Sequence, residues 1–256
     1  MGFRKLDAKE ACQFNSTLTS NLVFQYESFL NKKIENEIIR TRSQTFAPSG
    51  FRCARQQWFR LRGVDPDKPK KVDRSLDFTA FLGTCCHERL QSHIKEMLPT
   101  AWVELADYLE TKPEIKEKVV LEKDGYETKV SMNSPPVRFA CDGILKIEDK
   151  YYLLEIKTSE GSSFSHLTGP KPNHVDQVNC YCALLDIEDV IMIYQERNYG
   201  TIKSYQFSVP KYQRTEILHK MKYIMECVDN NIAPEKLPYG DLSCSGCSYQ
   251  SKCKLW

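Results

Sequence analysis

Two short stretches, FACDGIL at 139–145 and YYLLEIK at 151–157, each carry an acid inside sequence that alternates or runs apolar as a strand does. We predict strands over 137–147 and 151–157, joined by a hairpin turn at Glu148-Asp149-Lys150. A charge inside a near-apolar strand is costly unless it is paired or bound to a metal. The chain therefore needs a fold that gives Asp142 and Glu155 a polar site.

Strand alternation decides which side chains share that site. Glu155 and Lys157 point to one face, roughly 7 Å apart along the strand, and Ile156 points to the opposite face. If the two strands pair, Asp142 lies beside Glu155, and two carboxylates suit a hard divalent cation. Lys157 would then orient or deprotonate an attacking water and offset charge on a phosphate. The alternative is a set of charged residues on a solvated strand face.

Two helical signals accompany the acids. Gly83 precedes His87 by one helical turn, although a lone histidine on a helix is more often structural than a metal ligand. Gln177 and Tyr181 stand at positions i and i+4 of a second predicted helix, so both project from one face. An ordinary helix surface would show the same spacing.

The remaining pattern predicts an α/β fold in which helices bracket a small central sheet. The predicted helices are an amphipathic one marked by Leu22, Tyr26, Leu30, Ile34 and Ile38, a short one at 51–63 closed by Gly63, one from Leu82 to Leu98, and those at 174–186 and 211–229. Further strands are predicted at 117–123, 190–197 and 202–208, with loops at 64–74 and 158–173.

Composition favours one globular domain. The apolar share of 41% and the charged share of 27% are ordinary, and no repeat or long linker divides 1–256. We divide it into a helical N-terminal region at 1–74, a core at 75–230 and a cysteine-rich tail at 231–256. Without a secretory signal or an apolar run of about 20 residues, we expect a cytoplasmic protein that does not enter membranes.

A net charge of +2 requires any phosphate-binding surface to come from local clustering. One candidate is the basic segment 52–74, in which Trp58 and Phe59 accompany the charges. Its basic residues are Arg52, Arg55, Arg60, Arg62, Lys68, Lys70, Lys71 and Arg74. The segment either tracks a DNA backbone and stacks on unpaired bases, or is a solvated helix face.

The eleven cysteines fall into two groups. Those in apolar surroundings are expected to be small buried hydrophobes, namely Cys12, Cys85, Cys86, Cys141, Cys180, Cys182 and Cys227. Cys244, Cys247 and Cys253 instead form a compact three-thiolate unit among turn-forming residues, and Cys53 is the natural fourth ligand. A set of four cysteines suits either zinc or an iron–sulfur cluster, and spacing alone does not separate them.

The order Gly83/His87, Asp142-Gly143, Glu155-Ile156-Lys157-Thr158 and Gln177/Tyr181 resembles the RecB-like branch of the PD-(D/E)XK nuclease superfamily, over about 75–185. The resemblance implies a restriction-endonuclease-like core with a small mixed sheet. It also implies that His87, Asp142, Glu155 and the Ile156 carbonyl bind Mg²⁺ or Mn²⁺. Lys157 would assist the attacking water, and Gln177 and Tyr181 would place the DNA and the active-site residues.

The upstream Cys53 and the C-terminal three-thiolate unit together resemble the iron–sulfur nucleases, among them the CRISPR-associated iron–sulfur exonucleases. That resemblance implies a structural [4Fe–4S] cluster and exonuclease action on DNA ends, often single-stranded. Two alternatives remain open. One is a non-catalytic DNA-end-binding or adaptor subunit of a recombination or CRISPR-adaptation complex. The other is a zinc-stabilised protein-interaction module. The sequence identifies no protein partner.

Overall fold

The computed structural model describes residues 16–38, 44–67, 74–124, 127–238 and 240–255. The chain divides into two compact units, one made of 1–41 and 69–79 and the other of 42–68 and 80–256. In the first unit, helix α2 (Ser16–Ile38) forms as predicted, and Glu27 pairs with Arg74 at 2.8 Å. The predicted apolar stripe on α2 is not buried, because Leu22 and Tyr26 are 68% and 61% exposed.

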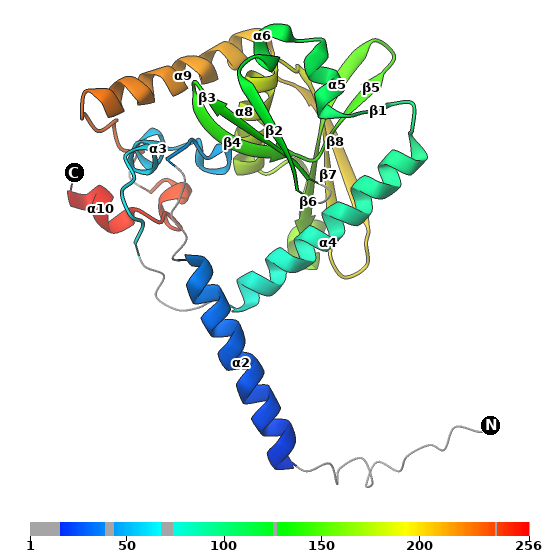
Figure 1. Ribbon diagram of the computed structural model, residues 1–256, viewed down its shortest axis with the longest axis vertical. Helices are drawn as coiled ribbons and strands as arrows, with labels where there is room; N and C mark the ends of the chain where they lie inside the picture. The colour runs from blue at the N-terminus through cyan, green and yellow to red at the C-terminus, as the bar shows by residue number, and fades with distance from the viewer. Residues whose placement is uncertain (1–15, 39–43, 68–73, 125–126, 239, 256) are drawn as a thin grey trace. The chain divides into compact units, whose positions relative to one another are not determined.

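A five-stranded mixed sheet organises the second unit (Figure 1). Its order is β1-β5-β6-β7-β8, in which β6 and β7 run parallel and every other pair is antiparallel. The strands are β1 (Trp102–Val103), β5 (Gly143–Ile147), β6 (Lys150–Ser159), β7 (Asp189–Glu196) and β8 (Ile202–Ser208). With helices around this sheet, the predicted α/β class with a small mixed central sheet is confirmed.

The two faces of the sheet belong to different cores. Leu154 and Ile156 of β6 pack with Ile94 of α4 (Arg74–Met97). Leu153 and the strand face that carries Glu155 belong to the main core, which includes buried residues of α8 (Pro172–Leu185) and α9 (Lys211–Asp229). Alternation along β6 therefore separates Ile156 from Glu155, as predicted.

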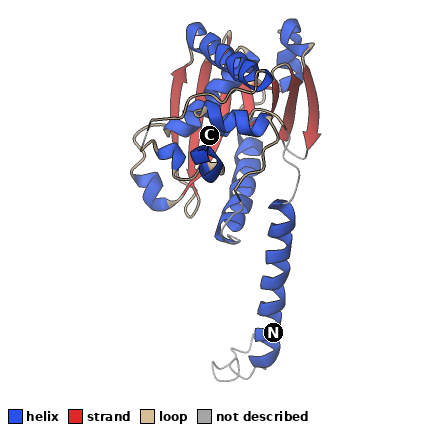
Figure 2. Ribbon diagram, turned by 90° about the vertical axis from the view of Figure 1, so that its left-hand side faces the viewer, coloured by secondary structure: helices blue, strands red, loops and turns tan. Residues whose placement is uncertain are grey.

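The strand predicted at 137–147 is two strands in two sheets. Its first half is β4 (Pro136–Cys141), which pairs with β3 (Glu127–Asn133) in the three-stranded sheet β2-β3-β4, whereas its second half is β5. Strand β2 (Val119–Asp124) matches the expectation at 117–123, but β3 was not predicted. Figure 2 shows the two sheets as separate groups of strands. Asp142 stands at the point where the chain leaves one sheet for the other.

Helix boundaries differ from the prediction where no buried stripe marks them. Helix α4 begins at Arg74 rather than Leu82, and its early residues Leu76, Phe78 and Phe81 are exposed. The helix predicted at 51–63 is the shorter α3 (Ala54–Leu61), and a 3-10 turn η1 (Pro48–Gly50) precedes it. The short helices α5 (Leu105–Glu110), α6 (Pro113–Lys116) and α7 (Gly161–Ser165) were not predicted. No described helix combines the length and apolar character needed to cross a bilayer.

The basic segment does not present aromatic rings to nucleic acid. Trp58 and Phe59 are fully buried, Trp58 Nε1 donates to the Cys227 carbonyl at 3.1 Å, and Phe59 stacks on Tyr249. Arg55 is also buried and donates to the Pro234 carbonyl at 2.6 Å. The stacking hypothesis for these two aromatics is therefore wrong. Residues 68–73, which hold the three lysines of the segment, lie outside the described residues.

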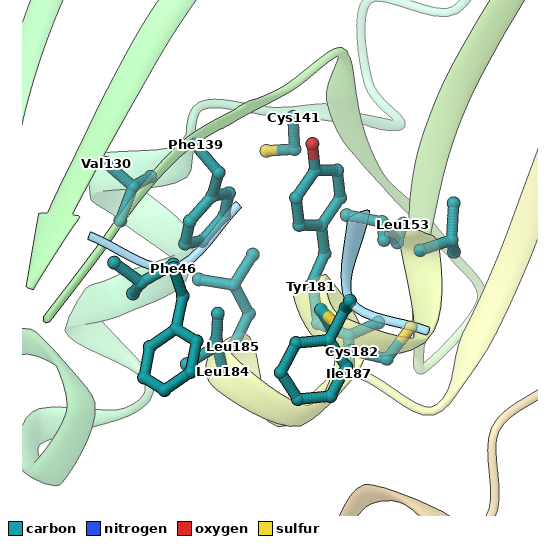
Figure 3. Close-up of a cluster of buried hydrophobic side chains, with 14 of the residues drawn as sticks. Phe46, Val130, Phe139, Cys141, Leu153, Tyr181, Cys182, Leu184, Leu185 and Ile187 are labelled. Atoms are coloured by element: carbon teal, nitrogen blue, oxygen red, sulfur yellow. The ribbon is translucent and has the colours of Figure 1, made fainter. Parts of the chain in front are cut away.

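Only some of the cysteines that were expected to be buried hydrophobes are buried. Those at 141, 180, 182 and 227 are buried as expected, but Cys85 is exposed and Cys86 is half-buried. Cys12 lies outside the described residues. Figure 3 shows Cys141 and Cys182 in the main core, where Phe139 of β4 stacks on Tyr181 of α8 with ring centroids 4.8 Å apart.

The junction at Asp142 depends on a glycine. A Cβ atom at Gly143 would stand 2.6 Å from the Trp102 ring, whereas a Cβ at Gly169 would meet nothing within 4 Å. We expect Gly143→Ala to lower the free energy of unfolding by about 1–3 kcal/mol, because the ring or the strand must move. Gly169→Ala is the matched control and should change it by less than about 0.5 kcal/mol. Urea unfolding measures both, and equal stabilities would contradict the packing argument.

Candidate active site

Asp142 is held by the end of the β5–β6 ladder. The ladder stops at the pair Gly143–Leu154, so the backbone N–H of Ile156 has no β5 partner. That N–H donates to Asp142 Oδ2 at 2.6 Å. Because a buried backbone donor needs an acceptor, the carboxylate is fixed where the strand partner ends. Strand pairing thus brings Asp142 beside Glu155, as predicted.

Helix α4 reaches the same carboxylate from its opposite side. His87 Nδ1 lies 3.1 Å from Asp142 Oδ1, and Gln91 Nε2 donates to the same oxygen at 3.1 Å. Burial opposes the charged imidazolium, but the hydrogen bond and the charge of Asp142 outweigh it and raise the pKa of His87. Gln91 was not predicted, although its i+4 spacing from His87 is a usable signal.

Glu155 carries the most costly charge of the site. Glu155 is 2% exposed, and burial together with the charge of Asp142 raises the pKa of its carboxyl group to about 7. Lys157 Nζ lies 2.6 Å from Glu155 Oε1 and opposes that shift. The second oxygen, Oε2, is buried and has no hydrogen-bond partner among the described residues. An acid so placed favours either a proton or a cation.

A chain of hydrogen bonds fixes Lys157 from the side of α8. Its ammonium donates to Gln177 Oε1 at 3.0 Å, and Gln177 Nε2 donates to the Tyr181 hydroxyl at 2.6 Å. Tyr181 is itself buried against Phe139. The pair predicted from its i, i+4 spacing therefore acts on Lys157, and the lysine has little freedom to leave Glu155.

The donor set suits a divalent cation. Two carboxylates and an imidazole converge from β6, the β4–β5 junction and α4, and within the described residues Glu155 Oε2 accepts no hydrogen bond. As the side chains stand, the described part of the chain holds no ready-made group of three or more His, Cys, Asp or Glu around a metal. Because Asp142 Oδ1 is occupied by His87 and Gln91, a metal would exchange with those contacts. Ligation by the Ile156 carbonyl stays a prediction.

The four candidate cluster cysteines lie where the two ends of the second unit meet. Burial raises the pKa of Cys53, and the neighbouring Cys247 and Cys253 raise it further. Burial likewise raises the pKa of Cys247, and the neighbouring Cys244 and Cys253 raise it further. As the side chains stand, the described residues include no group of three or more cysteines placed to hold a metal. The four cysteines are a candidate ligand set through their electrostatic effect on one another, since a bound metal would offset the repulsion between their thiolates.

Contacts outside the cysteines hold this meeting point together. The tail contains the 3-10 turn η2 (Leu242–Cys244) and helix α10 (Gln250–Leu255). Asp67 N–H donates to the Ser248 carbonyl at 2.6 Å, and Ser251 N–H donates to the Asp67 carboxylate at 2.9 Å. Arg52 pairs with Asp241 at 2.9 Å. The two ends are thus joined by polar contacts as well as by the Phe59–Tyr249 stack.

Comparison with known proteins gives only distant structural likenesses. No protein-family profile matches the chain, and no curated protein matches it. The solved structure of SSO0001 is 18% identical, with a TM-score of 0.48 over 91% of this chain and 97% of that one. The alkaline exonuclease LHK-Exo from Laribacter hongkongensis is 11% identical, with a TM-score of 0.40 over 77% and 93%. Its complex with dAMP gives 12% and 0.41 over the same shares. Likenesses this distant do not identify the chemistry.

The raised pKa of Glu155 predicts a pH-dependent stability. Folded Glu155 holds its proton up to about pH 7, whereas an unfolded glutamate releases it near about 4.3. Between those values the folded state binds more protons, so the free energy of unfolding of the metal-free protein falls as pH rises. Glu155→Gln cannot ionise and should lose this part of the fall.

Thermal unfolding in EDTA at about pH 5.5 and pH 8 measures the effect. We expect Glu155→Gln to be more stable than the parent at the higher pH and closer to it at the lower. Glu160→Gln, an exposed acid just past the same strand, is the control and should follow the parent. An equal fall with pH in the parent and in Glu155→Gln would contradict the assignment.

Proposed function

We propose that this chain is a metal-dependent nuclease that hydrolyses DNA from its ends. The observation that carries the proposal is the buried Glu155, which lies beside Asp142 and pairs with Lys157, and whose Oε2 has no partner in the described part of the chain. A charge arrangement this costly is typical of a functional site. The motif order set out above supports the same reaction.

Each side chain has a role that follows from its contacts. Asp142, Glu155 and His87 would hold the cation, with the Ile156 carbonyl as a further ligand. Mg²⁺ or Mn²⁺, when bound, supplies polarisation of the phosphate and a lowered pKa of water. Lys157 places its ammonium beside Glu155, where it faces negative charge that develops on the phosphate. Gln177 and Tyr181 hold Lys157 in that position.

The substrate class rests on the resemblance stated above. The resemblance favours DNA with free ends, often single-stranded. It implies no sequence specificity and does not fix the polarity of cleavage. The buried state of Trp58 and Phe59 removes one route by which the chain could stack on unpaired bases. Contact with DNA is therefore expected through phosphate-binding groups near Lys157.

A [4Fe–4S] cluster held by Cys53, Cys244, Cys247 and Cys253 is the second part of the proposal. What supports it is the electrostatic effect of the thiols on one another and their place where 52–67 meets the C-terminal tail. Bound there, a cluster contributes folding free energy, since the ligands are scattered in the unfolded chain. Structural zinc is the competing metal for the same four thiols.

A non-catalytic DNA-end-binding or adaptor subunit remains the alternative function. It would retain the cysteines for structure but has no need of a buried acid next to a lysine. The intact set of His87, Asp142, Glu155 and Lys157 therefore favours the enzyme.

Degradation of end-labelled DNA tests the nuclease. In Mn²⁺ or Mg²⁺ we expect loss of label that EDTA prevents, with Asp142→Asn and Lys157→Ala each lowering the rate by about 10²–10³-fold. Lys150→Ala removes an exposed ammonium from the far end of the same strand and is the matched control. Comparing 5′ and 3′ labels gives the polarity. Intact DNA under all metal conditions, from folded protein, would favour the adaptor.

Absorption of the anaerobically purified protein tests the cluster. We expect a brown protein with broad absorbance near about 400 nm, as cysteine-ligated iron–sulfur centres show. Cys253→Ser should lose the colour, whereas Cys85→Ser, which changes an exposed thiol outside the set, should keep it. A colourless preparation with stoichiometric zinc would assign the four thiols to zinc instead.

A further inference from the structure

One histidine near the site has no part in the contacts described so far. His174 lies in the first turn of α8, three residues before Gln177, and its Nδ1 is 2.8 Å from the Tyr194 hydroxyl. Tyr194 is the cross-strand partner of Lys157 in the parallel β6–β7 pair. His174 therefore stands beside the hydrogen-bond chain that holds Lys157, but outside it.

The surrounding hydrogen bonds fix the tautomer of this imidazole. The Lys171 backbone N–H donates to the Tyr194 hydroxyl at 2.9 Å, so that oxygen already acts as an acceptor. Burial raises the pKa of Tyr194, which keeps its own proton on the oxygen. Within the described residues the acceptor in reach of that proton is His174 Nδ1. The ring's remaining proton is then on Nε2.

The same surroundings keep the ring neutral. Burial, and after it the nearby ammonium groups of Lys157 and Lys171, lower the pKa of His174 to about 4. The ring is therefore an uncharged donor at neutral pH, and its Nε2–H has no protein acceptor among the described residues. A donor fixed in direction, with cationic side chains around it, suits an anionic acceptor.

We propose that His174 Nε2–H donates a hydrogen bond to a phosphate oxygen of the DNA, one linkage away from the phosphate that is cleaved. Helix positions i and i+3 lie about 5–6 Å apart. His174 therefore reaches the phosphate next to the cleaved one, beside which Lys157 is held by Gln177. Lys171 supplies positive charge at the same contact. A phosphate accepts hydrogen bonds whatever the base, so the contact gives register without sequence preference. This inference rests on the proposed function.

Two substitutions separate a phosphate contact from a structural role. His174→Asn keeps a polar group near Nδ1, in reach of Tyr194, but removes the distal donor. His174→Gln keeps an N–H near the position of Nε2 and sacrifices the Tyr194 contact. The phosphate contact predicts that Asn is the damaging change and Gln the milder one, whereas a purely structural histidine predicts the reverse.

The measurement is affinity for a fluorescent single-stranded oligonucleotide in EDTA, followed by cleavage kinetics in Mn²⁺. We expect His174→Asn to weaken binding by about tenfold or more, the range for a hydrogen bond to a charged group. KM should rise with kcat nearly unchanged, because the contact is made before and during the reaction. His174→Gln should recover most of the loss.

Substrate changes complete the test and do not depend on the stability of any variant. A neutral methylphosphonate is placed at one linkage at a time, and at the contacted linkage it should weaken binding by native protein but not further weaken His174→Asn. Full-strength binding by His174→Asn, or an equal loss at every linkage in both proteins, would overturn the contact. Absence of DNA binding by the native chain would overturn it too.

The binding arm separates this inference from the proposed function. DNA binding that depends on His174 in a protein that never cleaves would sustain the phosphate contact and refute the nuclease. Cleavage with no dependence on His174 would sustain the nuclease and refute the contact.

Discussion

The bond from the Ile156 N–H to the Asp142 carboxylate is the constraint on which the rest of the site depends. It exists because β4 and β5 pair with different strands, which leaves one backbone donor of β6 without a ladder partner. Asp142, at the point where β4 ends and β5 begins, accepts the hydrogen bond of that N–H and is thereby held beside Glu155. The sheet therefore creates the carboxylate pair, and α4 and α8 only complete it with His87 and with the side chains that hold Lys157.

Much of this site follows from local pattern. Alternation along 151–157 is enough to place Glu155 and Lys157 on one face, and a short turn at 148–150 is enough to pair the two strands. Helical spacing likewise placed Gln177 with Tyr181, since both relations are fixed within a few residues. Alternation could not show that the strand before Asp142 belongs to another sheet, because an apolar run does not indicate which strand it pairs with.

The failures have two physical causes, and the first is contact across long separations in sequence. Trp58 and Phe59 look like rings available for bases, yet their burial depends on Cys227 and Tyr249 far along the chain. The second cause is exposure. The beginning of α4 was not predicted because Leu76 and Phe78 are exposed and form no buried apolar stripe. The metal, the cluster and the substrate remain proposals built on donor chemistry and resemblance.

The joining of residues 52–67 to the tail 241–251 has a consequence for how the protein is made. Asp67 and Ser251 are 184 residues apart, so their contact cannot form until the chain as far as Ser251 has left the ribosome. Loop closure over such a length costs little more than over half of it, but it must wait for α10. Until then Phe59 of α3 has no Tyr249 to stack on, and Cys53 lacks the neighbouring Cys247 and Cys253, so a growing chain exposes that thiol until the tail emerges.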